Sequence, residues 1–475
     1  MDGQAFALQR PPLFDADDLA RIEQAALRLL DQVGVAVLDA GLLAQLTSRG
    51  FRAVGNRVLI QPERARGFLE AERERNGRRF SHSPSGAEPG ASAISLLLNP
   101  YAQFVHDLEA DRIVPFTTER LIEATRLADV LCDRGVASSP PGCPTDAAPA
   151  LQPVLQYWVA ATYSRQGRHP VDAKSRGTLP YVMEMAEVLG HPIRHLPVYV
   201  FSPLTLGGES LLCVLEFRRT LSSVHVCSMP GAGSTAPVGA ADGFALAAAE
   251  VVGSALLLTE ALEMPVSWGV ALFPVDFAGM AMVFGSPEAG LLQLASAEVD
   301  AYFHGWAWPS AAGTVHTMAK VPGPQACAEK ASLMTLNGLL GQRSFGGAGA
   351  LSLDEVFSAE QLLYDLEIRD HVEGLIGGLG AGCEPERCVS EVREALQQGS
   401  FLALETTAQA CRELRRPALF ERGFLSAWLA EGGRTIRSRA RSLVRDLVGR
   451  HEYALEADLQ RELDTVLARA RAALT

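Results

Sequence analysis

The chain has 475 residues, 48% of them hydrophobic, and carries a formal net charge of −13 at pH 7. This length is enough for two or three average domains, or for one large barrel with additions. The acidic balance argues against a nucleic-acid surface and against binding to anionic lipid, so we expect neither a nucleic-acid nor a membrane partner. The amino terminus is acidic and lacks the apolar stretch of a signal peptide, which predicts a soluble, cytoplasmic protein.

The first elements predict a small α/β extension over residues 1–115. An acidic cap precedes an amphipathic helix over 17–33, and a strand, a helix and a second strand follow, with a turn at Gly55 and Asn56. Another helix is predicted over 61–74, and the polar stretch 76–92 reads as a loop. We expect a new domain to begin near Phe116.

From there, short apolar segments alternate with helices at intervals of about 30 to 40 residues. Strands are predicted at 135–139, 169–175, 197–203, 224–230, 265–273, 301–306, 343–349 and 401–406. Such alternation implies parallel crossovers, and the number of units favours a (β/α)8 TIM barrel over 116–410, with an open doubly wound sheet as the alternative. Helices with charged faces fill 411–475, either as solvated surfaces or as an oligomer contact, and we expect a homo-oligomer.

The glycine-rich turn at 227–235, sequence CSMPGAGST, is a candidate anion or cofactor site. Its glycines permit close backbone approach, and a long helix follows it. The complete GxGxxG spacing and the lysine of a P-loop are both missing, which argues against a nucleotide. Packing alone would also explain the glycines. The candidate residues here are Met229, Gly231, Gly233 and Ser234.

The cysteines do not indicate a metal site. Cys383 and Cys388 are too far apart for a zinc knuckle. A zinc-dependent enzyme that activates a thiolate would need a Cys/His cluster, and His225 with Cys227 lacks an evident third ligand. We therefore expect reduced thiols and no bound metal.

Several segments in order resemble the trimethylamine methyltransferase superfamily, among them IEQAALRLLDQVGVAV, SMPGAGSTAPVGAADGFALAAAE, GSPEAGLLQLASAEVDAYF and QACAEKASLMTLNGLLGQRSFGGAGAL. The resemblance covers nearly the whole chain. It implies a (β/α)8 barrel that passes a methyl group from a methylated amine to the cobalt of a separate corrinoid protein, so cobalamin would be carried by a partner. The turn at 231–235 would then hold either a substrate carboxylate or a polar edge of the corrin.

Only the twenty standard residues occur here, so the chain is similar to the branch that lacks pyrrolysine and acts on quaternary amines such as glycine betaine. A quaternary ammonium leaves as a neutral amine, and its transfer needs orientation and desolvation rather than a general acid.

Quaternary ammonium groups are held by aromatic faces and nearby carboxylates. We predict the substrate-binding residues at strand ends, together with a titratable anchor: Phe201, Trp268, Phe273, Asp276, Trp306, His316 and Phe345. Phe277 and Trp308 are further aromatic candidates, and Lys174, Thr314 and Lys320 are further anchors for a carboxylate. We assign no catalytic residue.

Two positions depart from the family pattern. Thr406 stands where relatives show a histidine after the last strand, and Met318 stands where they show an aspartate before the lysine. These departures leave two alternatives open: methyl transfer directly to tetrahydrofolate, and a non-catalytic barrel or scaffold that binds an amine.

Overall fold

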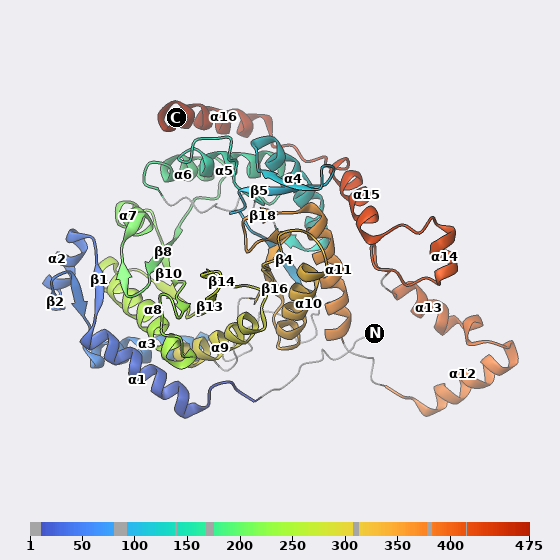
Figure 1. The fold of residues 1–475 in the computed structure, drawn as a ribbon, viewed down its shortest axis with the longest axis horizontal. Helices are drawn as coiled ribbons and strands as arrows, with labels where there is room; N and C mark the ends of the chain where they lie inside the picture. The colour runs from blue at the N-terminus through green and yellow to red at the C-terminus, as the bar shows by residue number, and fades with distance from the viewer. Residues whose placement is uncertain are drawn as a thin grey trace.

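The computed structural model describes residues 11–79, 93–137, 140–167, 175–306, 313–377, 382–414 and 416–475. Helices surround short parallel strands, and a series of further helices extends from one side of the molecule (Figure 1). The α/β class predicted from the sequence is confirmed by this arrangement.

The amino-terminal part contains α1, β1, α2, β2, β3 and α3, over Ala16–Gln32, Val35–Val37, Ala40–Ser48, Arg52–Val54, Arg57–Leu59 and Pro62–Arg79. A capping box starts α1, because the Asp15 side chain accepts from the Asp18 amide and the Asp18 side chain accepts from the Asp15 amide. Strand β1 pairs antiparallel with β3 and parallel with β9 (Thr205–Leu206), so the small extension continues into the sheet of the main body.

The main body contains two arcs of parallel strands. One has the order β15, β16, β4, β7, over Gly313–Thr314, Ser344–Ala348, Ser95–Leu98 and Val136–Ala137. The other has the order β12, β10, β8, over Val266–Trp268, Ser223–Ser228 and His195–Phe201. All neighbours within the two arcs pair in parallel. This is the strand and helix arrangement of a TIM-type barrel, and within each arc the carboxyl ends face the same way.

Helices follow the strands along the chain: α4, α5, α6, α7, α8, α9, α10 and α11, over Thr118–Val130, Gln152–Tyr163, Leu179–Val188, Gly208–Phe217, Ala240–Leu262, Pro287–His304, Pro324–Leu339 and Ala359–Ile376. A 3-10 turn, η1, covers Cys132–Arg134. Helix α8 is long and apolar enough to cross a membrane, but 83% of its most apolar window is buried inside the protein. It is therefore the central core helix, packed against α1, β10 and β12.

Two of the predicted strands are wrong. Residues 301–306 include the last turn of α9, which Ser286 caps at its start and Gly305 ends in a left-handed conformation. Residues 401–406 form a 3-10 turn, η2 (Phe401–Ala403), and the start of α13 (Glu405–Glu413). In both places the composition, rich in aromatic residues or leucine, is typical of a strand. The backbone hydrogen bonds nevertheless join residues that are close in the chain, as in a helix.

Two strands of the parallel arcs were not predicted, namely β4 and β15. Strand β4 lies between β16 and β7, although it precedes the predicted boundary at 115. The predicted strand at 169–175 lies almost wholly outside the described residues. The division of the chain at 115 and 410 stays a prediction.

Small sheets cap the strand ends. Strands β5, β6, β17 and β18, over Phe104–Asp107, Arg112–Pro115, Ala350–Leu351 and Val356–Phe357, form one of them. Strands β11, β13 and β14, over Gly231–Ala232, Phe273–Asp276 and Ala281–Met282, form the other. Each hairpin follows the carboxyl end of a parallel strand, so these loops surround the place where a barrel enzyme binds its substrate.

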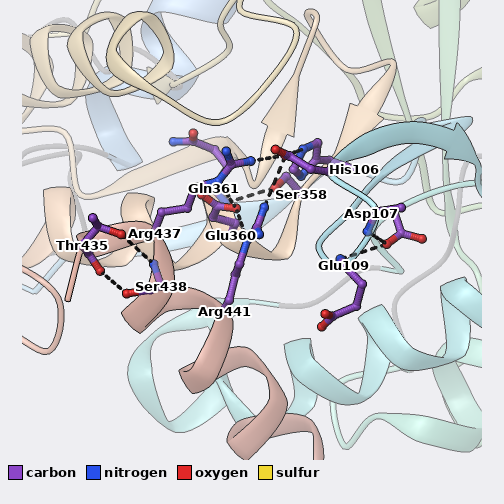
Figure 2. A network of polar contacts seen from close by, with 12 residues as sticks. His106, Asp107, Glu109, Ser358, Glu360, Gln361, Thr435, Arg437, Ser438 and Arg441 are labelled. Carbon is purple, nitrogen blue, oxygen red and sulfur yellow. Dashed lines mark hydrogen bonds and ion pairs between the residues drawn. The ribbon is translucent and has the colours of Figure 1, made fainter. Parts of the chain in front are cut away.

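The carboxyl-terminal helices are α12, α13, α14, α15 and α16, over Pro385–Gln398, Glu405–Glu413, Leu425–Ala430, Ile436–Val448 and Ala457–Leu474. Helix α16 packs on α5 and α6, and α15 packs on α11 and α4. The second contact is polar: the buried Glu360 carboxylate lies 3.1 Å from Arg437 Nε and 3.6 Å from Arg441 Nε (Figure 2). Asp111 lies 3.1 Å from His106 Nε2 and also pairs with both arginines.

Gly253 sets the distance between α8 and the amino-terminal extension. A Cβ atom at this position would lie 2.5 Å from Leu30 Cδ2 and 2.9 Å from Val35 Cγ2, inside a fully buried core. We expect Gly253→Val to lower the free energy of unfolding by about 1–3 kcal/mol, because overcrowding outweighs the gain in helix propensity. Gly67→Val is the matched control, since nothing lies within 4 Å of that helical glycine. Denaturant titration of both variants tests this, and equal stabilities would contradict it.

Candidate active site at the strand ends

His316 is the second residue after β15 and lies where the first arc ends. Asn99 Nδ2 is 3.1 Å from His316 Nε2, although the two residues are 217 positions apart in the chain. Asn99 follows β4, so two strands of the arc bring this pair together. Gly347, near the end of β16, has a φ angle of +89°, and a Cβ there would lie 3.0 Å from the His316 ring. The glycine therefore leaves room for the imidazole.

The φ angle of Gly347 lies in the left-handed region of backbone conformation. Such a backbone conformation is one that L side chains rarely adopt, so glycine is required here for conformation as well as for space.

The hydrogen bonds around Asn99 assign the His316 tautomer. Asn99 Oδ1 accepts from the Tyr101 amide at 3.2 Å, so its Nδ2 is the group that faces His316 and, at 3.5 Å, Asp354 Oδ2. Nε2 of His316 therefore accepts and Nδ1 carries the proton. His316 Nδ1 is shielded from solvent and has no hydrogen-bond partner in the described part of the chain.

Burial lowers the pKa of His316 from 6.5 to about 4, and the nearby charge of Lys330 contributes in the same direction. The imidazole is therefore neutral at physiological pH. Lys330 is fully buried, and its Nζ donates to Gly347 O at 2.9 Å and to Asp365 Oδ2 at 2.7 Å. This buried pair holds the strand end on which the His316 ring rests.

Two phenylalanine rings lie beside the imidazole. The Phe284 ring meets His316 edge to face with centroids 5.6 Å apart, and Phe273 lies 5.4 Å from Phe284. Phe273 belongs to β13 and Phe284 follows β14, so the hairpin after β12 reaches across to the end of β15. Of the predicted substrate-binding residues, the structure thus brings Phe273 and His316 together, with Phe284 between them.

The loop after His316 is fixed from two sides. Thr317 Oγ1 and the Met318 amide both donate to Glu329 on α10, the second at 3.2 Å. Lys320 Nζ donates to Ser352 Oγ at 2.7 Å. Lys320, predicted as a possible anchor, is therefore held by the loop between β17 and β18.

Trp268 and Trp306 lie on either side of another histidine. The His304 ring stacks on Trp268 with centroids 3.9 Å apart and on Trp306 with centroids 4.4 Å apart. Its Nε2 lies 3.1 Å from Trp268 O, and its Nδ1 lies 3.4 Å from Glu72 Oε1 of α3. One face of each indole is thus covered by His304.

The other predicted substrate residues lie apart from this cluster. Phe345 is fully buried on β16, whereas Phe201 at the end of β8 is 52% exposed. Asp276 is exposed and accepts from the Ala278 and Gly279 amides, both at 3.0 Å. Trp308 and Lys174 lie outside the described residues.

The glycine-rich turn satisfies its own amides. Gly231 N donates to Thr235 Oγ1 at 2.9 Å, and Gly233 N donates to Ala236 O at 2.8 Å. The amides of Ser234 and Thr235 both donate to Gly231 O. Helix α8 begins at Ala240, several residues later, so the predicted anion cradle has neither free amides in this turn nor a helix directly behind it. Met229 is exposed beside it.

Sequence reasoning missed Asn99, Phe284 and Glu250. Glu250 is fully buried on α8, where it accepts from the Leu204 amide at 2.9 Å and from Ser202 Oγ at 2.8 Å; burial raises its pKa. It therefore fixes the loop after β8. The run SLLLNP contains a signal for Asn99, because an apolar segment that ends in Asn-Pro marks a strand followed by a turn.

Thr406 lies on α13, not after a parallel strand. The comparison with a family histidine at that position therefore depended on the wrongly predicted strand at 401–406. The last strand of the parallel arcs along the chain is β16, within the residues that the structure describes.

The sequence profile of the trimethylamine methyltransferase (MTTB) family matches residues 7–475. The chain belongs to this family. It is 30% identical over 283 residues to trimethylamine methyltransferase MttB of Methanosarcina barkeri, covering 59% of this chain and 56% of the relative. It is 27% identical over 241 residues to MttB of Desulfitobacterium hafniense, covering 50% and 48%. The chain spans about half the length of these curated relatives.

Among solved structures, this family member is similar to the monomethylamine methyltransferase MtmB of Methanosarcina barkeri, with a TM-score of 0.41 and 10% identity. That match covers 92% of this chain and 88% of the other. The matched family and the curated relatives are named for methyl transfer from trimethylamine.

Proposed function

We propose that this protein removes a methyl group from a quaternary or tertiary, betaine-like amine at the strand ends around His316, in the cytoplasm. The methyl group would pass to a corrinoid carried by a partner protein. When bound, the Co(I) of that corrinoid supplies the nucleophile that attacks the methyl carbon. The proposal rests on family membership and on one observation, the neutral His316 imidazole beside Phe284 with an unpartnered Nδ1 proton.

The neutral state of the His316 imidazole supports the proposal of a cationic substrate. With its pKa at about 4, His316 adds no positive charge near the ammonium at neutral pH. The nearby ammonium of Lys330 is paired with Asp365 at 2.7 Å. The rings of Phe273 and Phe284 offer faces and edges of the kind that hold quaternary ammonium groups. A quaternary amine leaves as a neutral molecule, so these residues need only bind and orient it.

The Nδ1 proton of His316, which has no partner among the described residues, supports a substrate that carries a hydrogen-bond acceptor in addition to its ammonium group. A buried donor without a partner costs free energy, and a ligand carboxylate would satisfy it with a charge-assisted hydrogen bond. This favours a betaine over choline or trimethylamine, which have no carboxylate.

Exposed apolar side chains near the strand ends of the second arc support a protein partner. Phe201, Met229, Val238 and Phe277 are between 49% and 70% exposed; the first ends β8, and the others lie on the segments that follow β10 and β12. Apolar patches of this kind mark binding surfaces. They suit the apolar edge of a corrin and the protein that carries it.

Methyl transfer from glycine betaine to cob(I)alamin, followed by absorbance, tests the proposal with two variants of His316. An asparagine amide can occupy the position of Nδ1, whereas a glutamine amide reaches only the position of Nε2. We expect His316→Gln to lower kcat/KM for betaine by about 10- to 100-fold, the value of one charge-assisted hydrogen bond, and His316→Asn to keep most of it.

Choline is the control substrate, for which the two variants should differ little. The proposed methyl donor is wrong if the wild-type protein transfers no methyl group from any methylated amine. The proposed role of Nδ1 is wrong if both variants use betaine equally well.

A further inference from the structure

Helices α12, α13 and α14 and the turn η2, here called the arm, project from the body of the protein (Figure 1). Among the described elements, the packing contacts of α12 and α13 run mainly to η2, within the arm itself. The arm is nevertheless fixed at its base. Glu367 of α11 accepts from the Ala418 amide at 2.8 Å and from the Phe420 amide at 3.2 Å, and α15 follows with the contacts of Figure 2.

The arm exposes an unusual amount of apolar surface. Nine large apolar side chains in and beside its helices are between 41% and 86% exposed: Val389, Val392, Leu396, Phe401, Leu402, Leu414, Phe424, Leu425 and Leu429. Together they expose on the order of 1,000 Å², taking part of the 150–250 Å² of a large side chain for each. Monomeric proteins rarely expose contiguous apolar patches of more than a few hundred Å², so a partner is expected to cover part of this surface.

The charges on α12 indicate what that partner is. Val389, Val392 and Leu396 form a stripe at spacings of three and four residues along the helix. Glu386 and Arg393 are seven residues apart and therefore lie along one edge of this stripe. In an antiparallel pair of identical helices, the same edge of both helices lies at the contact, and the two chains run past each other in opposite directions. Glu386 of each helix then faces Arg393 of the other.

We propose that α12 pairs antiparallel with α12 of a second copy of this chain, across a twofold axis between Glu386 and Arg393. The interface is isologous, with each copy contributing the same stripe and the same two charges. The pairing of α12 covers Val389, Val392 and Leu396 of each copy, so it buries only part of the apolar surface of the arm. The pairing joins two bodies without covering the strand ends around His316.

Charge reversal on α12 tests this pairing, with the mass of the full chain measured by sedimentation over a range of concentrations. We expect the wild type to dimerise. Glu386→Arg or Arg393→Glu alone places like charges opposite each other at both symmetric contacts, and should weaken dimerisation at least about tenfold. The double variant Glu386→Arg/Arg393→Glu restores opposite charges and should dimerise as the wild type does.

Glu394→Arg is the matched control, because Glu394 lies on the side of α12 away from the stripe and should leave dimerisation unchanged. Equal melting temperatures across the set would show that the variants are folded. A monomeric wild type, single reversals without effect, or a double variant that stays dissociated would each overturn the proposal and leave the arm to a different partner. None of these outcomes depends on methyl transfer.

Discussion

Replacing Lys330 by methionine is expected to lower the free energy of unfolding by about 3–5 kcal/mol, the effect of removing one partner from a buried ion pair. Lys330 and Asp365 are both fully buried, with 2.7 Å between Nζ and Oδ2. The substitution leaves the Asp365 carboxylate with the Gly349 amide and Gln361 Nε2 as donors but without its cation. Denaturant titration at pH 7 measures the loss.

The double variant Lys330→Met/Asp365→Asn separates the lost pair from lost packing. Neutralising the carboxylate removes the uncompensated charge, so we expect the double variant to be more stable than Lys330→Met alone. If the double variant loses as much unfolding free energy as the two single variants lose together, the ion pair contributes nothing beyond packing. Lys330→Met should also raise the pKa of His316, since the Lys330 charge is one of the two causes that lower it.

The stability of the protein should fall in acid because of His316. The unfolded imidazole has a pKa near 6.5, whereas the folded one has a pKa of about 4. Below pH 6.5 the unfolded chain binds a proton that the folded chain does not, so the free energy of unfolding decreases as the pH falls. The contribution is complete above pH 6.5 and is lost progressively as the pH falls through about 4. The full loss is about 3 kcal/mol, from 1.36 kcal/mol for each unit of pKa.

The measurement is the difference in unfolding free energy between the wild type and His316→Gln at a series of pH values from 7 to 4. We expect the unfolding free energy of the variant to rise relative to that of the wild type as the pH falls, because glutamine does not titrate. Substitution of His191, which lies on the surface, is the control for the loss of a histidine as such. A difference that stays constant between pH 7 and 4 would show that His316 titrates alike in the folded and unfolded chains.

Some of the site could be predicted from local signals. The apolar segments with following loops indicated β8, β10 and β16. His316 was identified as a titratable residue among Gly and Thr, although the strand before it, β15, was not predicted. Phe273 was found at the end of a predicted strand. Strands of two residues, such as β15, have no periodicity to detect, and the aromatic last turn of α9 has the composition of a strand.

The sequence by itself determined the family and the α/β class, because the order of its motifs and the alternation of apolar segments with helices are properties of the chain alone. Only the tertiary structure decided which side chains meet. It placed Asn99 and Phe284 beside His316, covered one face of Trp268 with His304, and satisfied the amides of the turn at Gly231 internally. These contacts depend on strand register and loop path, which join residues far apart in the chain and leave no periodic pattern in it.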